Sequence, residues 1–261
     1  MRFGIVTKDA NDTSGLVGKV SAYLKDKGHE VFGEEKLAGC QYILCFGGDG
    51  TLIHKACEHA HFGVPFVGIN TGNLGFLAAV EADEWKSGID SLLSGKVFIS
   101  ERMSLSVKVG KELYKAVNEA VVKGLYRVIE LNIEVGSERF LKVAGDGLIV
   151  STQTGSTAYS LSSGGPIVDA DLNCFLLTPV NPIGLPIPSF VLSPEGKIAV
   201  RVEKGSDVSL VIDGQEHAKL TVGQVVEFSR GENNIKLVYF DQHHFLRALN
   251  AKFGLSTRAS G

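Results

Sequence analysis

Apolar residues in the first hundred positions alternate between short continuous runs and helical spacing. The runs RFGIV (2–6), YILCF (42–46) and PFVGI (65–69) are typical of strands that are buried on both faces. Residues 13–27 and 52–60 instead repeat apolar positions at the period of a helix. The order strand, helix, strand, helix, strand predicts a parallel sheet with flanking helices.

The pattern changes near residue 97, where short β-type runs with polar or glycine punctuation begin and continue almost to the C-terminus. Such spacing predicts a mainly antiparallel, β-rich second domain. Residues 243–254 return to helical spacing. We therefore expect an α/β domain at 1–96, completed by a C-terminal helix at 243–261, and a β-rich domain at 97–242.

Composition excludes several classes of protein. Hydrophobic residues make up 44% and charged residues 21%, as in soluble globular proteins, and the net charge of -3 gives no reason to expect nucleic-acid or membrane-surface binding. No apolar run reaches the roughly 18 residues of a membrane span, and the N-terminus reads as a strand rather than a signal peptide. Cys40, Cys45, Cys57 and Cys174 show no CxxC spacing, so we expect free thiols in a reducing cytoplasm and no zinc site.

The stretch GGDGT follows the apolar run at 42–46 and precedes a helical pattern. Glycines between a strand and a helix let phosphate oxygens approach backbone N–H groups, and here the turn consists of Gly47, Gly48, Gly50 and Thr51 around Asp49. A carboxylate repels phosphate unless a metal ion or a hydroxyl group intervenes. Phosphoryl transfer to an alcohol needs both kinds of help: Mg²⁺ on the donor phosphates and a base oriented at the attacking oxygen. The alternative is that Asp49 only caps the helix.

A second turn, NTGNLGFL (70–77), follows the run at 65–69. Asn70 and Asn73 can hydrogen-bond a ligand or the turn itself, and Gly72 and Gly75 leave backbone room. Ligands of parallel sheets bind at the carboxyl ends of strands, where this turn and GGDGT would both lie. An ordinary strand–helix loop is the alternative.

The segment DGLIVSTQTGSTAYSLSSGGP (146–166) is rich in hydroxyl groups and glycines. From Ser156 onward it has the small residues of a helix start that a ribose or phosphate can approach closely, and Tyr159 can pack on a flat base. A generic Ser/Thr loop is the alternative.

Two shorter signals remain. VNEAVV (117–122) places Asn118 and Glu119 in an apolar strand, where an amide and a carboxylate suit a ribose diol or an amide ligand. An exposed pair on an edge strand is the alternative. IDGQ (212–215) can be a simple hairpin turn.

In this order, GGDGT, NTGNLGFL, NEAVV, DGLIVSTQTGSTAYSLSSGGP and DGQ resemble the NAD kinase family. The resemblance implies an α/β and a β-rich domain with the active site in the cleft between them. It also implies phosphorylation of the adenosine ribose 2′-hydroxyl of NAD by ATP with Mg²⁺ or another divalent metal. A homodimer or homotetramer is the expected assembly. The metal ligands are unknown.

Carried over by motif position, Asp49 is the catalytic base toward the 2′-hydroxyl. The resemblance also gives a set of NAD-binding residues: Asp49, Gly50, His54, Asn118, Glu119, Arg127, Asp146, Thr154, Thr157, Ala158, Tyr159, Ser160, Leu161, Ser162 and Gln215. Of these, His54, Arg127 and Gln215 depend on a looser alignment, and a solvent-facing helical histidine is the alternative for His54. The family usually has proline where Gln153 stands, so we expect a less rigid loop there.

Two other functions remain open. Another kinase with a GGDGT turn, acting on a lipid or a sugar phosphate, leaves the Ser/Thr-rich segment unexplained, and the chain lacks a basic amphipathic run. A non-catalytic NADP(H)-binding module would bind dinucleotide without turnover. An oxidoreductase is disfavoured because no GxGxxG follows the first strand.

Overall fold

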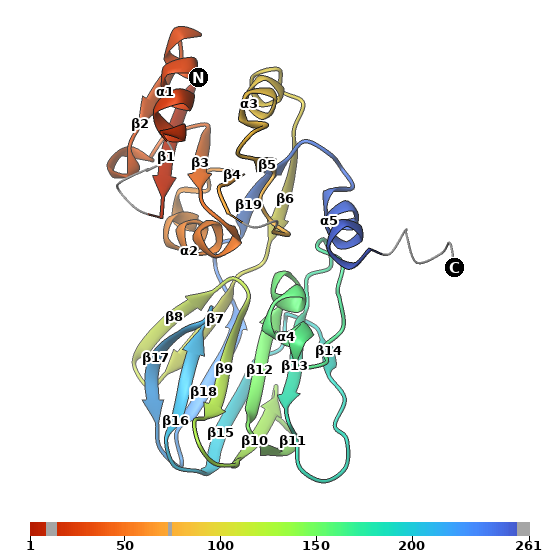
Figure 1. Ribbon diagram of the computed structural model, residues 1–261. Coiled ribbons are helices and arrows are strands. Elements are labelled where there is room, and N and C mark those ends of the chain that lie inside the picture. Colours follow the sequence, from red (N-terminus) through yellow and green to blue (C-terminus); the bar gives the residue numbers. More distant parts are fainter. Residues whose placement is uncertain (9–14, 73–74, 255–261) are drawn as a thin grey trace, which may run out of the picture. The chain divides into compact units, whose positions relative to one another are not determined.

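The computed structural model describes residues 1–8, 15–72 and 75–254. The chain divides into two compact units, one made of the residues up to Glu101 together with those from Ile235, and the other of Arg102–Asn234 (Figure 1). Each unit has its own sheets and its own hydrophobic core.

The first unit is an α/β layer structure. Its elements are β1 (Arg2–Thr7), α1 (Leu16–Asp26), β2 (Glu30–Phe32), the 3-10 helix η1 (Glu34–Lys36), β3 (Tyr42–Phe46), α2 (Asp49–His59), η2 (Ala60–Phe62), β4 (Phe66–Asn70), β5 (Val80–Glu81), α3 (Trp85–Leu93), β6 (Phe98–Arg102), β19 (Ile235–Tyr239) and α5 (His244–Phe253). The strand order is β2-β1-β3-β4-β19-β6, and β5 also pairs with β4. Pairing is parallel from β2 through β19, as the buried apolar runs predicted.

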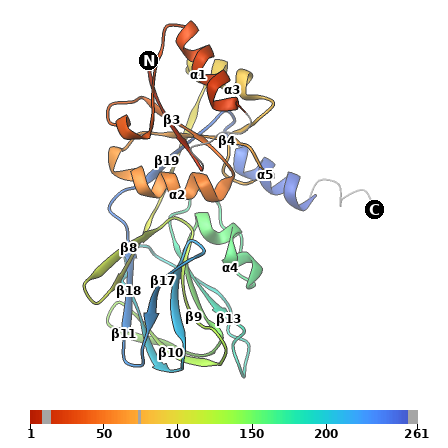
Figure 2. The ribbon, with the colours of Figure 1, turned by 60° about the vertical axis from the view of Figure 1, so that its left-hand side comes forward.

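Helices cover both faces of this sheet. Apolar side chains of α1 and α3 pack with Phe3, Leu44 and Ile69 in one core. The opposite face receives α2, whose Leu52 lies against Gly68 of β4. In Figure 2, α1 and α3 lie on one side of the strands and α2 on the other.

Two segments lie in a different sheet from the one expected. β6 and β19 belong to the sheet of the first unit, whereas the sequence pattern placed residues 97–101 and 235–239 in the β-rich domain. The pairing of Leu237 with Phe66 is parallel, so β19 continues the α/β sheet. Alternating apolar residues identify a strand but do not choose its neighbour, because both sheets offer the same backbone groups.

The second unit consists of two antiparallel sheets. Its elements are β7 (Leu105–Val109), β8 (Glu112–Ala116), β9 (Glu119–Gly124), β10 (Ile129–Val135), β11 (Glu138–Gly145), β12 (Gly147–Thr152), η3 (Thr154–Thr157), α4 (Tyr159–Ser162), β13 (Phe175–Val180), β14 (Phe190–Leu192), β15 (Ile198–Lys204), β16 (Val208–Ile212), β17 (Gln215–Leu220) and β18 (Val225–Arg230). The orders are β11-β10-β15-β18-β7-β8 and β14-β13-β12-β9-β16-β17. Alternate apolar residues of both sheets fill one shared core.

The chain crosses between these sheets at one place that bears on the site. β8 ends at Ala116 in one sheet, and β9 begins at Glu119 as an interior strand of the other. Val117 and Asn118 therefore form the whole connection. Among the described residues, no helix is both long and apolar enough to cross a membrane.

Glycine is required where β4 meets α2. A Cβ on Gly68 would lie 2.8 Å from Leu52 Cδ2 and 2.9 Å from the Cα of Ala78. We expect Gly68→Ala to lower the free energy of unfolding by about 1–3 kcal/mol, because the backbone at residue 78 must shift. Denaturant unfolding followed by the fluorescence of Trp85, the only tryptophan, measures this change in the first unit.

The matched control is Gly18→Ala in α1, where an added Cβ meets nothing within 4 Å. This variant should be more stable than the wild type by up to about 1 kcal/mol, because alanine favours the helix. Equal effects of the two substitutions would contradict the packing argument.

Candidate active site

Asp49 is the first residue of α2, and Gly48 holds the N-cap position. Asp49 therefore stands inside the helix rather than at its cap, and its side chain bonds a separate segment, so the alternative that it only caps the helix is wrong. Its carboxylate accepts hydrogen bonds from three consecutive backbone N–H groups of the second turn. The distances are 2.6 Å from Phe76 N, 3.1 Å from Leu77 N and 3.3 Å from Ala78 N.

This arrangement joins the two turns that the sequence predicted at the carboxyl ends of β3 and β4. A Cβ on Gly75 would overlap the Asp49 carboxylate, so the close approach requires glycine. The three donors orient the carboxylate. Asp49 as a whole is half-buried.

The second turn uses Asn70 for its own structure. Asn70 is buried, its amide donates to Glu81, and its carbonyl oxygen accepts from Gly72 N. Asn73 lies outside the described residues. Phe76 also contacts α5, because its carbonyl lies 3.3 Å from His244 Nε2 and Lys252 Nζ lies 4.1 Å from its ring centroid.

In the second unit, the Asp213 carboxylate accepts three backbone N–H groups of the crossover between the sheets, as the Asp49 carboxylate does for residues 76–78 of the first unit. Asp213 Oδ2 accepts from Val117 N at 2.8 Å, and Oδ1 accepts from Asn118 N at 2.9 Å and from Glu119 N at 3.1 Å. IDGQ therefore forms the hairpin turn between β16 and β17, and its aspartate also fixes the backbone of residues 117–119 by these hydrogen bonds. Asp213 can reach the crossover because it adopts a left-handed backbone conformation, with φ of 44°.

The end of β12 packs onto the same crossover. Thr152 Oγ1 donates to the Val117 carbonyl and accepts from Thr154 N and Gly155 N. A Cβ on Gly155 would overlap the Asn118 carbonyl. The structure thus gathers Asn118, Glu119 and the 152–157 segment around one buried backbone junction.

Glu119 is the most perturbed carboxyl group of this region. Its side chain is 6% exposed, on an interior strand, so the alternative of an exposed edge-strand pair is wrong. Burial, followed by the negative charge of Asp213, raises the pKa of Glu119 to about 8, although the backbone N–H of Tyr159 opposes the shift. Burial also raises the pKa of Asp213, against the effect of its three N–H donors.

The Ser/Thr-rich segment forms η3 and α4 as a small-residue helical stretch. Three of its hydroxyl groups are used internally: Ser156 Oγ bonds the backbone of Val168, Thr157 Oγ1 donates to the Thr154 carbonyl at 3.3 Å, and Ser160 Oγ lies 2.9 Å from Thr178 Oγ1. Ser160 remains a predicted pocket residue, with its hydroxyl engaged inside the fold. Thr154 Oγ1, in contrast, is buried and has no hydrogen-bond partner among the described residues.

The remaining residues of this segment are accessible to different degrees. Tyr159 is 41% exposed and can present its ring to a base. Ser162 is exposed, and half-buried positions are occupied by Thr157, Ala158 and Leu161.

Gln153 anchors the loop that enters this segment. Its side chain is 1% exposed, and its Nε2 donates to Asn173 Oδ1 at 3.0 Å. The backbone φ of -57° is one that proline also adopts. The side-chain bond thus ties the loop down, and the expectation of a looser loop finds no support.

Three predicted residues lie away from the Asp49 turn and from the crossover at residues 117–119. Arg127 follows the far end of β9 from Glu119, and Asp146 lies at that same end, where Gly124 N donates to its carbonyl. Asp146 is exposed and accepts from Asn181 Nδ2. His54 is exposed on α2, 3.9 Å from Glu58, which favours the solvent-facing alternative. Gln215, by contrast, is two residues from Asp213.

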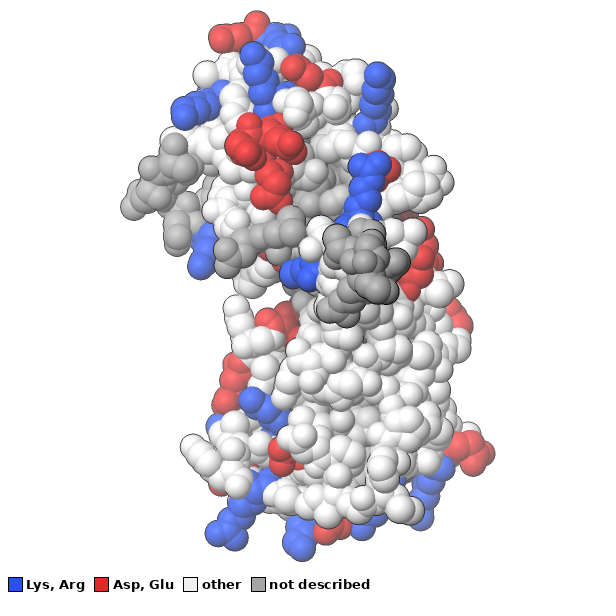
Figure 3. Space-filling view, turned by 45° about the vertical axis from the view of Figure 1, so that its right-hand side comes forward, with Lys and Arg blue, Asp and Glu red and all other residues white. Residues whose placement is uncertain are grey.

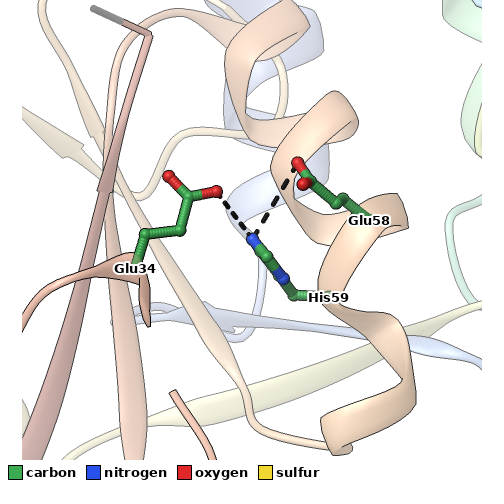
Figure 4. Close-up of side chains that lie close together, drawn as sticks. All are labelled: Glu34, Glu58 and His59. Carbon is green, nitrogen blue, oxygen red and sulfur yellow. Dashed lines mark hydrogen bonds and ion pairs between the residues drawn. The ribbon is translucent and has the colours of Figure 1, made fainter. Parts of the chain in front are cut away.

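Glu34, Glu58 and His59 form a possible metal-binding group among the described residues (Figure 4). His59 Nε2 lies 2.8 Å from Glu34 Oε1 and 3.9 Å from Glu58 Oε2. However, Lys55 Nζ lies 2.6 Å from the same Glu34 oxygen and 3.3 Å from Glu58 Oε2. The ammonium group occupies the cation position, so this cluster ties η1 to α2 and does not favour a metal.

Two residues that organise the site escaped the sequence analysis. Asp213 stood in a motif that reads as a turn, and Thr152 stood in an apolar strand. The only available signal was an aspartate before glycine at the end of an apolar run, and most such pairs are simple hairpin turns.

An α/β unit with a glycine-flanked carboxylate and a β-rich unit with a hydroxyl-lined junction define a nucleotide-dependent phosphotransferase class. Residues 4–97 match the family model described as the ATP-NAD kinase N-terminal domain. Residues 118–240 match that of the ATP-NAD kinase C-terminal domain. The chain belongs to the NAD kinase family.

Individual relatives agree. A protein of Fusobacterium nucleatum named NAD kinase is 35% identical over 253 residues, which cover 95% of each chain. A NAD kinase of Nitratidesulfovibrio vulgaris is 39% identical and covers 82% of this chain and 78% of its own.

Solved structures show the same fold. The structure of an NAD kinase from Archaeoglobus fulgidus in complex with ATP has a TM-score of 0.79 and 26% identity, and the match covers 96% of this chain and 98% of that one. Yeast NADH kinase complexed with NADH has a TM-score of 0.86 at 21% identity, with coverage of 97% and 87%.

The buried carboxyl of Glu119 should lower the stability of the protein at neutral pH. The unfolded chain loses the Glu119 proton near the ordinary value of 4.5, whereas the folded chain keeps it to about pH 8. Stability from this group is fully present below pH 4.5 and is lost as the pH rises through 8. We expect Glu119→Gln to raise the melting temperature at pH 7 by a few degrees and to have little effect at pH 4.

Calorimetric scans at both pH values test this. Glu216→Gln is the matched control, because Glu216 lies on β17 of the same sheet, is 46% exposed and forms a surface ion pair with Lys219. A Glu119→Gln protein no more stable than the wild type at pH 7 would contradict the buried, protonated state.

Proposed function

We propose that the chain transfers the γ-phosphoryl group of ATP to the 2′-hydroxyl of the adenosine ribose of NAD, which yields NADP. Family membership over nearly the whole chain supports an alcohol-phosphorylating enzyme of this kind. The observation that carries the proposal is the Asp49 carboxylate, oriented by three backbone N–H groups at the start of α2.

Asp49 has the chemistry of a positioned proton acceptor. An ionised carboxylate offers about four acceptor sites, of which three are taken by Phe76, Leu77 and Ala78. The remaining site lies on Oδ2, which accepts only one N–H. A substrate hydroxyl that donates to this oxygen is oriented for attack. Its proton passes to Asp49 as the new O–P bond forms and the bond between the γ-phosphorus and the departing ADP breaks.

The second unit provides the groups that we propose hold NAD. Asn118 and Glu119 lie at the crossover, Thr154 has a buried hydroxyl with no partner in the described part of the chain, and Tyr159 is 41% exposed. Ribose hydroxyls and a base edge pair well with such groups. The other carried-over residues remain proposals by motif position.

We propose that Mg²⁺ enters with ATP. Mg²⁺ usually keeps several waters and is held by the phosphates with one or two carboxylates, so a dedicated protein cage is not needed. The described residues fit this, because their one three-ligand group is already filled by Lys55. When bound, Mg²⁺ neutralises the triphosphate charge. The Archaeoglobus relative was solved with ATP, which supports ATP as the donor.

We further propose a homodimer or homotetramer. Residues 147–194 contain only two charged residues, Asp169 and Asp171. Exposed apolar side chains of this stretch include Ile183 at 62% and Leu185 at 86%. Figure 3 shows a broad area of the second unit without Lys, Arg, Asp or Glu. Such a surface supports association of copies of the chain. All four cysteines are free thiols, which supports a reducing cytoplasm.

The purified protein should form NADP from NAD, ATP and Mg²⁺, detected with an NADP-specific dehydrogenase. Asp49→Asn should lower turnover by roughly 10²–10⁴-fold while NAD still binds, because the amide cannot accept the proton. Asp26→Asn, at the exposed end of α1, is the control and should retain activity. Dinucleotide binding without turnover in the wild type would favour the binding-module alternative. Turnover of a lipid or sugar phosphate alone would favour the other kinases.

Displacing the Asp49 carboxylate without removing it should also impair turnover. A Cβ on Gly75 would overlap that carboxylate, so Gly75→Ala must move either the turn or Asp49. We expect at least about a tenfold fall in kcat with a small change in the KM for NAD. Gly18→Ala is the matched control for the substitution itself, and unchanged kcat in Gly75→Ala would contradict the role of the turn.

A further inference from the structure

The buried carboxyl group of Glu119 and the half-buried carboxyl group of Asp213 both lie at the crossover between β8 and β9. Asp213 Oδ1 accepts the backbone N–H of Glu119 itself, so the Asp213 carboxylate lies against the start of β9. The Glu119 side chain is 94% buried, and its Oε2 has no hydrogen-bond partner among the described residues. An unpartnered oxygen in a buried site calls for a ligand or a proton.

The surroundings of the two groups decide which one carries a proton. Asp213 receives three backbone N–H donors, and each of these favours the ionised form. Glu119 receives help only from the backbone N–H of Tyr159 and faces the Asp213 charge. Ionising the buried Glu119 beside a second carboxylate charge is costly, so the proton belongs on Glu119.

We propose that Glu119 works as a neutral carboxylic acid, kept in that form by its own burial and by the neighbouring Asp213 carboxylate, and that it donates a hydrogen bond to an acceptor atom of the bound dinucleotide. This deepens the proposed function and rests on it. Asp213 is a positioning residue in this scheme, because it holds the 117–119 backbone and controls the proton without touching the ligand.

The charged surroundings support the proposal. Burial and the charge of Asp213 raise the pKa of Glu119 to about 8, so the acid form prevails at neutral pH. The other charged group that acts on this pair is His217 of β17, which faces Asp213 and lowers the pKa of that carboxyl. Ser151, opposite Glu119 in the ladder, is uncharged.

The acid form also suits binding. An ionised Glu119 accepts hydrogen bonds only, whereas the protonated group donates through one oxygen and accepts through the other. If only the acid form binds NAD, affinity stays constant below pH 8 and falls above it. At pH 9 the dissociation constant should be about tenfold higher than at pH 7, because about one tenth of Glu119 remains protonated.

The first test is a ¹³C NMR titration of the side-chain carboxyl groups in the protein without nucleotide, with Glu119→Gln used to assign the signal. We expect a midpoint near pH 8 in the wild type. Asp213→Asn, which removes the neighbouring charge, should lower the midpoint. The control Glu216→Gln should leave it unchanged. A wild-type midpoint near the ordinary 4.5 overturns the proposal, whatever the fate of the Asp213 variant.

The second test is calorimetric binding of NAD at pH 6.5, 7 and 9. Glu119→Gln keeps one donor and one acceptor, so it should bind NAD within a few-fold of the wild type at pH 7 and lose the weakening at pH 9. Glu119→Ala should bind poorly at every pH. A Gln variant that binds as poorly as the Ala variant overturns the proposal, because the negative charge would then be required.

The two tests separate failure of this inference from failure of the proposed function. The NMR titration needs no ligand. If the wild type shows the high midpoint but binds no NAD at any pH, the proposed function fails and the donor role fails with it. If the wild type binds NAD equally at pH 7 and 9, the function stands and the donor role is overturned.

Discussion

A half-buried aspartate that accepts three consecutive backbone N–H groups is the interaction on which this structure depends, and each unit contains one among its described residues. Asp49 binds residues 76–78, and Asp213 binds residues 117–119. Hydrogen bonds to a charged acceptor are roughly twice as strong as those between neutral groups. Each aspartate therefore fixes a turn that no regular ladder holds.

The two aspartates are both half-buried, but we propose different roles for them. Asp49 lies beside a glycine-rich turn and its Oδ2 accepts only one N–H group, so the residue that organises the turn can also meet a substrate hydroxyl. The effect of Asp213 passes to Glu119 through the backbone and through its charge. The same arrangement of a carboxylate and three N–H groups thus serves two roles: we propose that Asp49 contacts the substrate and that Asp213 acts through Glu119.

Close approach of backbone to side chain is the second constraint. At Gly75 and Gly155 an added Cβ would overlap Asp49 or the Asn118 carbonyl. The hydroxyl groups differ too: Thr152 bonds the crossover, Ser156 and Ser160 bond Val168 and Thr178, and Thr154 Oγ1 has no partner among the residues that the structure describes. In a segment that looks uniformly polar in sequence, some hydroxyl groups therefore stabilise the fold and others are available to a ligand.

The sequence by itself determined the elements and the motifs. Buried apolar runs gave β1, β3 and β4, helical spacing gave α1, α2 and α5, and the short β-type runs gave the second unit. The motifs located Asp49, Glu119 and the 154–162 segment, because glycines and polar groups in apolar surroundings are visible without coordinates. Local periodicity is set by backbone geometry, which the sequence encodes residue by residue.

Only the tertiary structure decided which groups meet. It placed β6 and β19 in the α/β sheet, took the hydroxyls of Ser156 and Ser160 into internal bonds, and separated Asp146 and Arg127 from Glu119 along β9. It also brought Asp213 to a crossover almost a hundred residues earlier in the chain. Strand pairing and the donors around a carboxylate depend on contacts between distant segments, and such contacts leave no local pattern in the sequence.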